Sequence, residues 1–177
     1  TCLVQKIESQ FNDTVDILVN SAGIAVLGLI ENVPLKAYND NLQLNFFAPL
    51  SLIKSVLPGM KQKKSGQIIN LFSGVGKRGL PGVSSYCVSK FALNGLTESL
   101  RVEVSPYNID VILISPGLVQ TRFANNCKIY GPLKETFTHG KAVKSEFVAE
   151  KIVEASIKKK REVVLSAKTL FGIHANY

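Results

Sequence analysis

Three short apolar runs recur along the chain, each bounded by polar or turn-forming residues: Asp16–Val19, Ile68–Phe72 and Ile109–Ile114. They lack the strict alternation of polar and apolar residues that marks a strand with one solvated face. Continuous apolar runs of this length are typical of strands buried on both faces. They therefore predict three strands of a parallel sheet, and a shorter apolar run at 163–165 predicts a last strand.

Between the strands, apolar residues recur with the spacing of amphipathic helices. This spacing predicts helices over residues 3–11, 35–60, 84–104 and 146–159, with Pro49 bending the second of them. Strands that alternate with helices in this way predict an α/β fold, in which helices cover both faces of a parallel sheet.

Two stretches show no such period. Residues 61–65 form a predicted polar turn, and residues 122–145 form a predicted long irregular segment. Long loops without secondary structure are usually functional or disordered in compact domains. Because residues 122–145 leave the edge of the sheet where a ligand is expected, we predict that they are mobile and set substrate choice.

Each of the three main strands ends in residues that favour a tight turn or a close approach to a ligand. These residues are Asn20-Ser21-Ala22-Gly23, Ser73-Gly74, and Pro116-Gly117 followed by Thr121. In open parallel sheets, ligands bind beyond the carboxyl ends of the strands. The same residue types are common in ordinary turns, which is the simpler explanation of each motif alone. Their convergence on one edge of the sheet favours a binding site.

A candidate catalytic group follows the second strand. Tyr86 and Lys90 lie four residues apart in a predicted helix that Ser84 or Ser85 is expected to cap, so their side chains share one face. A nearby ammonium favours the phenolate and lowers the pKa of a tyrosine, which makes the phenol a usable general acid or base. Ser73, at the end of the strand, is placed to hydrogen-bond the same substrate oxygen.

The Tyr-x-x-x-Lys spacing is weak by itself, because short motifs arise by chance. The chain holds a second match, Tyr130 with Lys134, in which Gly131-Pro132 argues against a helix. The alternative for Tyr86 is an ordinary half-buried helix residue beside a solvated lysine. The strand-end motifs favour the catalytic interpretation.

The composition limits the class of protein but does not identify a function. The 177 residues are 46% hydrophobic, which indicates one globular domain, and the net charge is +8. The basic run Lys158–Arg161 is interpreted as a solvated helix end, with nucleic-acid binding kept as an alternative. The three cysteines show no metal-ligand spacing, so no metal site is expected. The chain starts at Thr1 without Met, and we expect a piece of a longer polypeptide.

Taken in order, these motifs resemble the short-chain dehydrogenase/reductase superfamily over nearly the full length of the chain. The matching residues are Asn20-Ser21-Ala22-Gly23 for the NNAG motif, Asn45 for an active-site Asn, Ser73, Tyr86 and Lys90 for the catalytic set, and Pro116-Gly117 with Thr121. The stretch from Lys77 to Leu93 is similar to the branch of that superfamily that includes members 7 and 7B.

The resemblance implies hydride transfer between a nicotinamide cofactor, NAD(P) with NADP(H) slightly favoured, and a small-molecule alcohol or carbonyl. Tyr86 would be the acid/base, and Lys90 would lower its pKa and hold the nicotinamide ribose. Ser73 would orient the substrate oxygen, and Asn45 would hold a water that relays protons. The remaining cofactor-binding residues implied by the resemblance are Asn20, Ala22, Gly23, Pro116, Gly117, Val119 and Thr121.

One feature of that superfamily is missing from this sequence. No TGxxxGxG turn, which cradles the pyrophosphate at a helix N-terminus, precedes the first strand. We therefore expect the catalytic half of a Rossmann-like, doubly wound sheet: a single partial NAD(P)-binding domain over 1–177 without its N-terminal strands. The strand at Asp16–Asn20 would then present an apolar edge prone to association.

Other functional classes stay open at this point. A non-catalytic binding or interaction module that has lost cofactor binding is the main alternative to an enzyme. The resemblance also implies a homo-oligomer formed through the helices at 35–60 and 84–104. For the full-length protein, it leaves a cytoplasm-facing or a membrane-associated location open.

Overall fold

The computed structural model describes residues 2–133 and 142–165. Its central sheet has four parallel strands in the order β1-β3-β4-β8: β1 (Ile17–Asn20), β3 (Gly66–Leu71), β4 (Ile109–Ser115) and β8 (Glu162–Val164). The register pairs Asn20 with Asn70 and Leu71 with Ile114, which brings the carboxyl ends of the strands to one edge. The predicted parallel α/β fold is confirmed.

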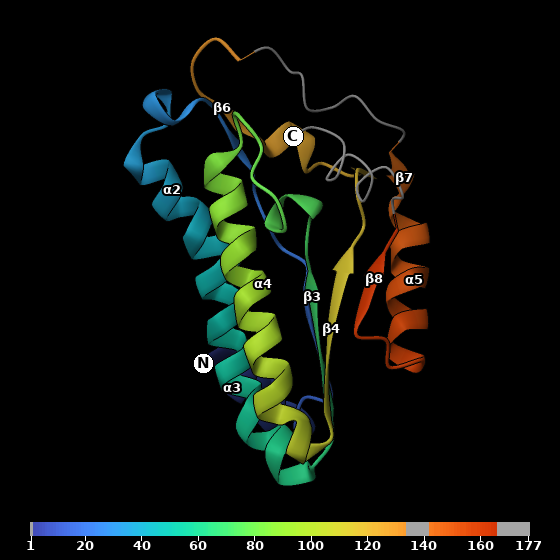
Figure 1. Cartoon of the computed structure of the whole chain (residues 1–177). Helices are drawn as coiled ribbons and strands as arrows, with labels where there is room; N and C mark the ends of the chain where they lie inside the picture. The colour runs from blue at the N-terminus through green and yellow to red at the C-terminus, as the bar shows by residue number, and fades with distance from the viewer. Residues whose placement is uncertain (1, 134–141, 166–177) are drawn as a thin grey trace.

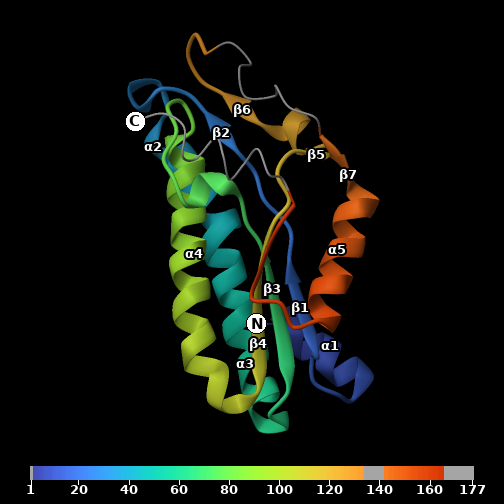
Figure 2. The same ribbon diagram turned by 45° about the vertical axis from the view of Figure 1, so that its right-hand side comes forward.

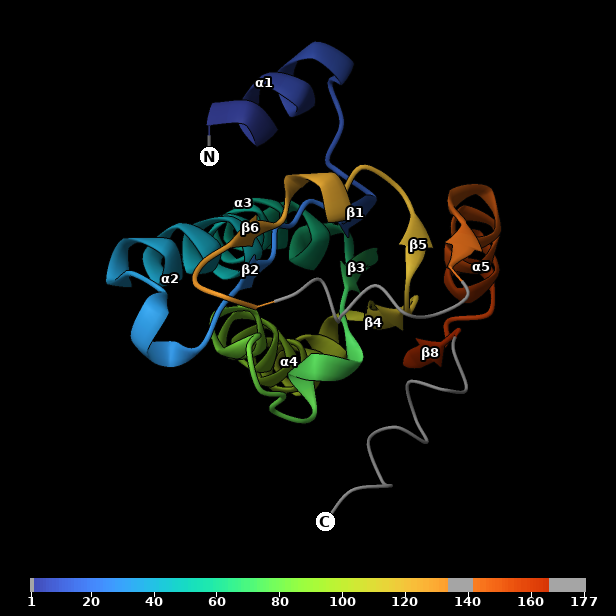
Figure 3. The ribbon, with the colours of Figure 1, turned by 90° about the horizontal axis from the view of Figure 1, so that it is seen from above.

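Helices cover both faces of this sheet. The helices are α1 (Cys2–Phe11), α2 (Leu35–Leu42), α3 (Ala48–Lys63), α4 (Ser84–Val104) and α5 (Ser145–Ile157). The long helices α3 and α4 run side by side on one face, and α5 lies on the other (Figures 1 and 3). The upper edge of the sheet, beside the N-terminal end of α4, carries the loops that follow β1, β3 and β4 (Figure 1).

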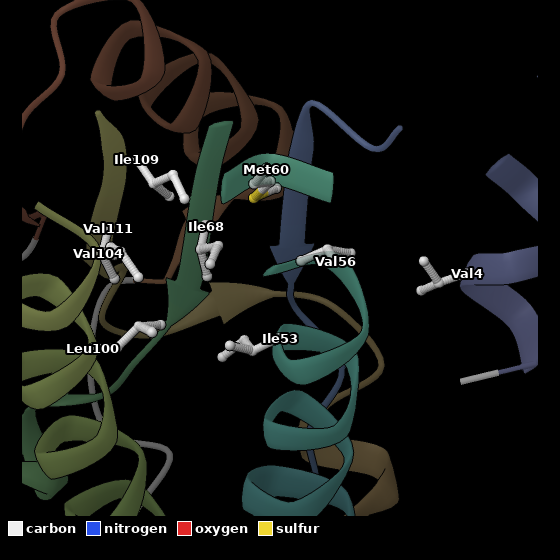
Figure 4. Close-up of a cluster of buried hydrophobic side chains, with 9 residues drawn as sticks. All are labelled: Val4, Ile53, Val56, Met60, Ile68, Leu100, Val104, Ile109 and Val111. Atoms are coloured by element: carbon white, nitrogen blue, oxygen red, sulfur yellow. The ribbon is translucent and has the colours of Figure 1, made fainter. Parts of the chain in front are cut away.

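Two hydrophobic clusters hold these layers together. Successive strand residues point to opposite faces, so Ile68 packs in the cluster formed with α3 and α4, whereas Ile69 packs under α5. Figure 4 shows the larger cluster, which is built from side chains of α1, α3, α4, β3 and β4: Val4, Ile53, Val56, Met60, Ile68, Leu100, Val104, Ile109 and Val111. The apolar runs of the sequence therefore form the core, as their pattern predicted.

Shorter elements surround the functional edge. Two-residue strands pair β2 (Val26–Leu27) with β6 (Lys128–Ile129), and β5 (Val119–Gln120) with β7 (Val143–Lys144). The single turns of 3-10 helix are η1 (Ile30–Asn32), η3 (Gly74–Gly76), η4 (Ser105–Tyr107) and η5 (Ala124–Asn126). Figure 2 shows β2 and β6 side by side at the top of the molecule, beyond the carboxyl ends of the sheet strands.

The prediction of one bent helix over 35–60 was wrong in its detail. A π-helical turn, η2 (Gln43–Phe47), separates α2 from α3. In a regular helix the Asn45 carbonyl would accept from residue 49, but Pro49 has no N–H, and Ala48 instead donates to the Gln43 carbonyl five residues earlier. The helix also continues through the predicted polar turn to Lys63 and ends at Lys64, whose φ is 51°.

Two further local predictions need correction. The residue that caps α4 is Val83, and the hydroxyls expected to cap it bond to α2 instead: Ser84 to Tyr38 (2.6 Å) and Ser85 to Asn41 (3.0 Å). The segment 122–145 is not irregular throughout, because η5, β6 and β7 fall within it and α5 begins at Ser145. Residues 134–141 of that segment, including Lys134, lie outside the described residues.

The charged and apolar surfaces agree with the sequence interpretation. Lys158 and Lys160 form ion pairs with Glu154, and Lys159 pairs with Asp110, so the basic run is an ion-paired helix end. Within the described ranges, β1 pairs only with β3, and the predicted apolar edge is confirmed by its half-exposed side chains. No helix in the described part of the chain is long and apolar enough to cross a membrane.

Candidate active site

The end of β3 and the start of α4 bring together Ser73, Tyr86 and Lys90. Tyr86 lies in the first turn of α4 and Lys90 in the next, so both face the loop that begins at Ser73. Lys90 is 5% exposed and donates a hydrogen bond from Nζ to the Leu71 carbonyl at 3.0 Å. The same Nζ lies 5.7 Å from the centre of the Tyr86 ring.

Burial dominates the electrostatics of this group. It raises the pKa of Tyr86 to about 12, and the hydrogen bond with the Ser73 side chain lowers that pKa by less than burial raises it. The thiols of Cys127 and Cys87 raise the Tyr86 pKa further. Burial also lowers the pKa of Lys90 to about 8.

The expected lowering of the Tyr86 pKa by Lys90 is therefore not what the structure shows. The lysine donates to a backbone carbonyl instead of the phenol, and burial is the largest influence on the Tyr86 pKa. At neutral pH the Tyr86 phenol is protonated. Its O–H is consequently a proton donor in this structure.

Asn45 sits in the π-helical turn, is 1% exposed, and joins three elements. Its Oδ1 accepts from the Ile24 N–H at 2.9 Å, and its Nδ2 lies 2.8 Å from the Ile24 carbonyl. The same Nδ2 is 2.5 Å from Asn41 Oδ1 and 3.0 Å from Ser89 Oγ. The protein thus uses both amide hydrogens of Asn45, and its side chain ties α4 to the loop after β1.

Gly23 completes this junction. A side-chain carbon at that position would lie 3.2 Å from Asn45 Oδ1 and 3.9 Å from Lys90 Nζ. A contact of 3.2 Å would be too tight unless the Asn45 side chain moved. Because glycine has no side chain, the loop after β1 can approach both Asn45 and Lys90. The candidate cofactor residue Gly23 therefore lies beside the candidate catalytic residues.

Asn20 belongs to a second buried chain of polar groups. Its Nδ2 donates to Asn70 Oδ1 at 2.8 Å, Asn70 donates to Thr97 at 2.9 Å, and Thr97 donates to the Leu93 carbonyl at 2.7 Å. This chain links neighbouring strand ends to the middle of α4. Buried polar groups that are fully paired fix a unique arrangement of the elements they join.

The other predicted cofactor residues lie in the loops that follow β1 and β4. Pro116 is buried, and Gly117 turns the chain with φ of 77°. Val119 lies in β5 and Thr121 is exposed, with its hydroxyl accepting from the Phe123 N–H at 3.2 Å. Ala22 is exposed beside Gly23. Among the described residues, no hydrogen bond or ring contact joins Ala22, Asn20 or Thr121 to Tyr86.

Sequence reasoning missed several members of the site. The polar pairs Asn41 with Asn45, and Ser85 with Ser89, each repeat at helical spacing, which is the signal that could have revealed two facing polar stripes. Phe123, whose ring contacts Tyr86, carried no signal in the sequence. Within the described ranges, no group of three or more His, Cys, Asp or Glu side chains could hold a metal ion.

Comparisons with known proteins agree with this geometry. A family model described as short chain dehydrogenase matches residues 1–129. Dehydrogenase/reductase SDR family member 7B of Mus musculus is 34% identical over 157 residues, which cover 86% of this chain and 48% of that protein. Retinol dehydrogenase 8 of Homo sapiens is 41% identical over 109 residues, which cover 62% of this chain and 35% of that protein. The resemblance to member 7B expected from the sequence is thus confirmed.

Solved structures show the same fold. A short-chain dehydrogenase from Streptomyces avermitilis superposes with a TM-score of 0.86 at 24% identity, covering 97% of this chain and 67% of that chain. An NAD+-bound xylitol dehydrogenase superposes with a TM-score of 0.63 at 30% identity, covering 67% of this chain and 46% of that chain. The chain spans about half the length of the curated member 7B relatives it matches. By the extent of the family match and by its fold, the chain belongs to the short-chain dehydrogenase family.

Proposed function

We propose that this chain is the catalytic portion of a nicotinamide-dependent carbonyl reductase or alcohol dehydrogenase. The observation that carries the proposal is the convergence of Ser73, Tyr86 and Lys90 at the carboxyl edge of the sheet. A hydroxyl, a phenol and an ammonium at one point suit proton transfer to or from a substrate oxygen. Membership of an oxidoreductase family supports the same chemistry.

Each residue then has a distinct task. Tyr86 donates its phenolic proton to the substrate carbonyl oxygen in reduction, and accepts the hydroxyl proton in oxidation. Ser73 hydrogen-bonds the same oxygen and orients it. Lys90, charged below its pKa of about 8, stabilises the phenolate that forms. Asn45 positions α4 against the Gly23 loop through the hydrogen bonds described above.

The residues present fit one half of a nicotinamide cofactor. Gly23 lets the loop after β1 lie close to Asn45 and to the buried ammonium of Lys90, which would hold the nicotinamide ribose. Asn20, Ala22, Pro116, Gly117, Val119 and Thr121 would line the rest of this edge. The bound cofactor would supply or accept the hydride. The Gly-rich turn that cradles phosphates is not among the residues of this sequence.

The proposal slightly favours NADP(H) over NAD(H), and the two are told apart by measuring turnover with each. One relative of known structure is a xylitol dehydrogenase with bound NAD+, and another relative is a retinol dehydrogenase. Because these names cover very different alcohols, they support a small-molecule alcohol or carbonyl as substrate and no particular one.

A homo-oligomer through the helices at 35–60 and 84–104 is part of the proposal. The outer surfaces of the π-helical turn and α4 expose large apolar side chains: Phe47, Val88, Phe91 and Val102, each at least 45% exposed. A side-chain carbon at Gly95 of α4 would meet no atom within 4 Å, so another helix can approach closely there. Two copies packed through this face would bury it.

A non-catalytic binding module is the second candidate, favoured by the absence of a phosphate-cradling turn from this sequence. Isotope transfer separates the two. A polypeptide that contains this chain would be incubated with NADPH deuterated at the transferred position and with a ketone. Deuterium at the carbinol carbon of the product, detected by mass spectrometry, is expected of an oxidoreductase. The absence of both NADPH binding and transferred deuterium would favour the binding module, which is proposed to have lost cofactor binding.

A further inference from the structure

Phe123 forms an aromatic wall against the candidate acid/base. Its ring centre lies 5.9 Å from that of Tyr86, and the two planes meet at 55°. Centroid distances of 4.5–7 Å with tilted planes are the favourable range for aromatic pairs. Phe123 is 37% exposed, so the part of its ring that does not pack against protein stays open to solvent.

The surrounding backbone holds this ring in place. The Phe123 N–H donates to Thr121 Oγ1 at 3.2 Å, and its carbonyl accepts from the Asn126 N–H at 3.2 Å and lies 3.3 Å from Cys127 Sγ. A few residues later the chain joins β6, which pairs with β2. The segment is therefore anchored on both sides of Phe123, and the ring position is set by the fold rather than by a bound molecule.

Two loops at the carboxyl edge of the sheet also present apolar side chains. Leu80 lies in the loop before α4 and is 38% exposed, and Leu118 follows Gly117 and is 42% exposed. A hydroxyl group placed against such side chains gives up hydrogen bonds to water without replacing them. An aryl or alkyl group in the same place gains burial and, for an aryl group, ring contact.

We propose that Phe123 is a specificity-determining residue, which selects substrates whose reacting carbon carries an aryl or alkyl group over polyhydroxylated ones. This inference rests on the proposed function. Contact with one apolar wall of this size discriminates by roughly 10–200-fold. We therefore expect a polypeptide that contains this chain to reduce 1-phenyl-2-propanone with a kcat/KM at least about 10-fold above its kcat/KM for dihydroxyacetone.

The test compares Phe123→Ala with Phe147→Ala, a matched control of similar exposure (39%) whose ring lies on α5 and contacts Lys151. Turnover is followed by NADPH oxidation with the two ketones. Phe123→Ala should lower the ratio of the two kcat/KM values about 10-fold, and Phe147→Ala should leave it unchanged. A preference of the wild type for dihydroxyacetone, or an unchanged ratio in Phe123→Ala, would overturn the proposal.

A second readout needs no turnover and keeps the two proposals distinguishable. The ionisation of Tyr86 in this chain is followed by absorbance at 295 nm as pH is raised. The signal of Tyr86 is the difference in absorbance between each protein and the same protein with Tyr86→Phe. Phe123→Ala should let water reach the phenol and lower its apparent pKa, whereas Phe147→Ala should not. If no ketone is reduced, the proposed function fails, and an unchanged titration in Phe123→Ala then overturns the role of Phe123 as well.

Discussion

Replacing Asn45 with alanine tests whether one buried amide holds the site together. Its side chain is 1% exposed and hydrogen-bonds both backbone groups of Ile24, the Asn41 side chain and the Ser89 hydroxyl. Alanine leaves these groups in the interior without the amide. The effect should therefore reach the loop after β1 and the helix that carries Tyr86 together.

The expected size follows from the groups left unpaired. The side chains of Asn41 and Ser89 can turn toward other partners, so we count only the Ile24 N–H and carbonyl as losing theirs. Leaving a fully buried polar group unsatisfied costs about 1–3 kcal/mol. Ile24 is only partly buried, so water replaces part of the loss and the pair together should cost about 1–3 kcal/mol. At ~2–4 °C per kcal/mol for a chain of this size, the thermal midpoint should fall by roughly 2–12 °C.

Urea unfolding followed by far-UV circular dichroism measures this change in the free energy of unfolding. Asn39→Ala, at an exposed position of α2, is the matched control and should stay within about 0.5 kcal/mol of wild type. A double-mutant cycle with Ser89→Ala should show coupling of about 0.5–3 kcal/mol, because the two side chains are in contact. An Asn45→Ala protein within about 1 kcal/mol of wild type would refute the reasoning.

Three further outcomes are expected of this chain. Burial lowers the pKa of Lys90 from 10.5 to about 8. Between pH 8 and 10.5 the unfolded chain therefore binds more protons than the folded chain, and the free energy of unfolding rises with pH. Lys90→Met should flatten this rise in the urea midpoints, and an unchanged slope would contradict the prediction. Calorimetry should find no micromolar binding of NADPH, because this sequence lacks the turn that cradles its phosphates. Val19→Lys should reduce self-association in sedimentation, because Ile17 and Val19 are 50% and 45% exposed on an edge strand; an unaltered profile would contradict this.

Periodicity was enough to predict the framework of the fold. The runs at Ile68–Phe72 and Ile109–Ile114 became β3 and β4, and the helix predicted over 84–104 has those bounds in the structure. The two strands and one face of α4 bury their apolar residues, so the pattern of the sequence is largely the pattern of the core. The carboxyl-edge position of the motifs then followed from the parallel sheet.

The sequence could not predict features that depend on contacts between distant residues. The π-helical turn at Asn45 needs both Pro49 and the partners of the amide, which come from two other segments. The predicted direction of the Tyr86 pKa shift was wrong because the rest of the fold buries Tyr86, and burial raises its pKa. Pairing of the two-residue strand β6 with β2 left no periodicity to detect in the segment predicted to be irregular.

The central claim is that Tyr86 transfers the proton, and one comparison tests it most directly. In a polypeptide that contains this chain and oxidises NADPH with a ketone, Tyr86→Phe removes one oxygen and little volume. General acid/base catalysis supplies about 10²–10⁴-fold, or about 3–5 kcal/mol of barrier, so kcat should fall by at least that factor. Tyr130→Phe, in the second Tyr-x-x-x-Lys match, should leave kcat unchanged. Near-wild-type turnover by Tyr86→Phe, or a comparable loss in Tyr130→Phe, would contradict the claim.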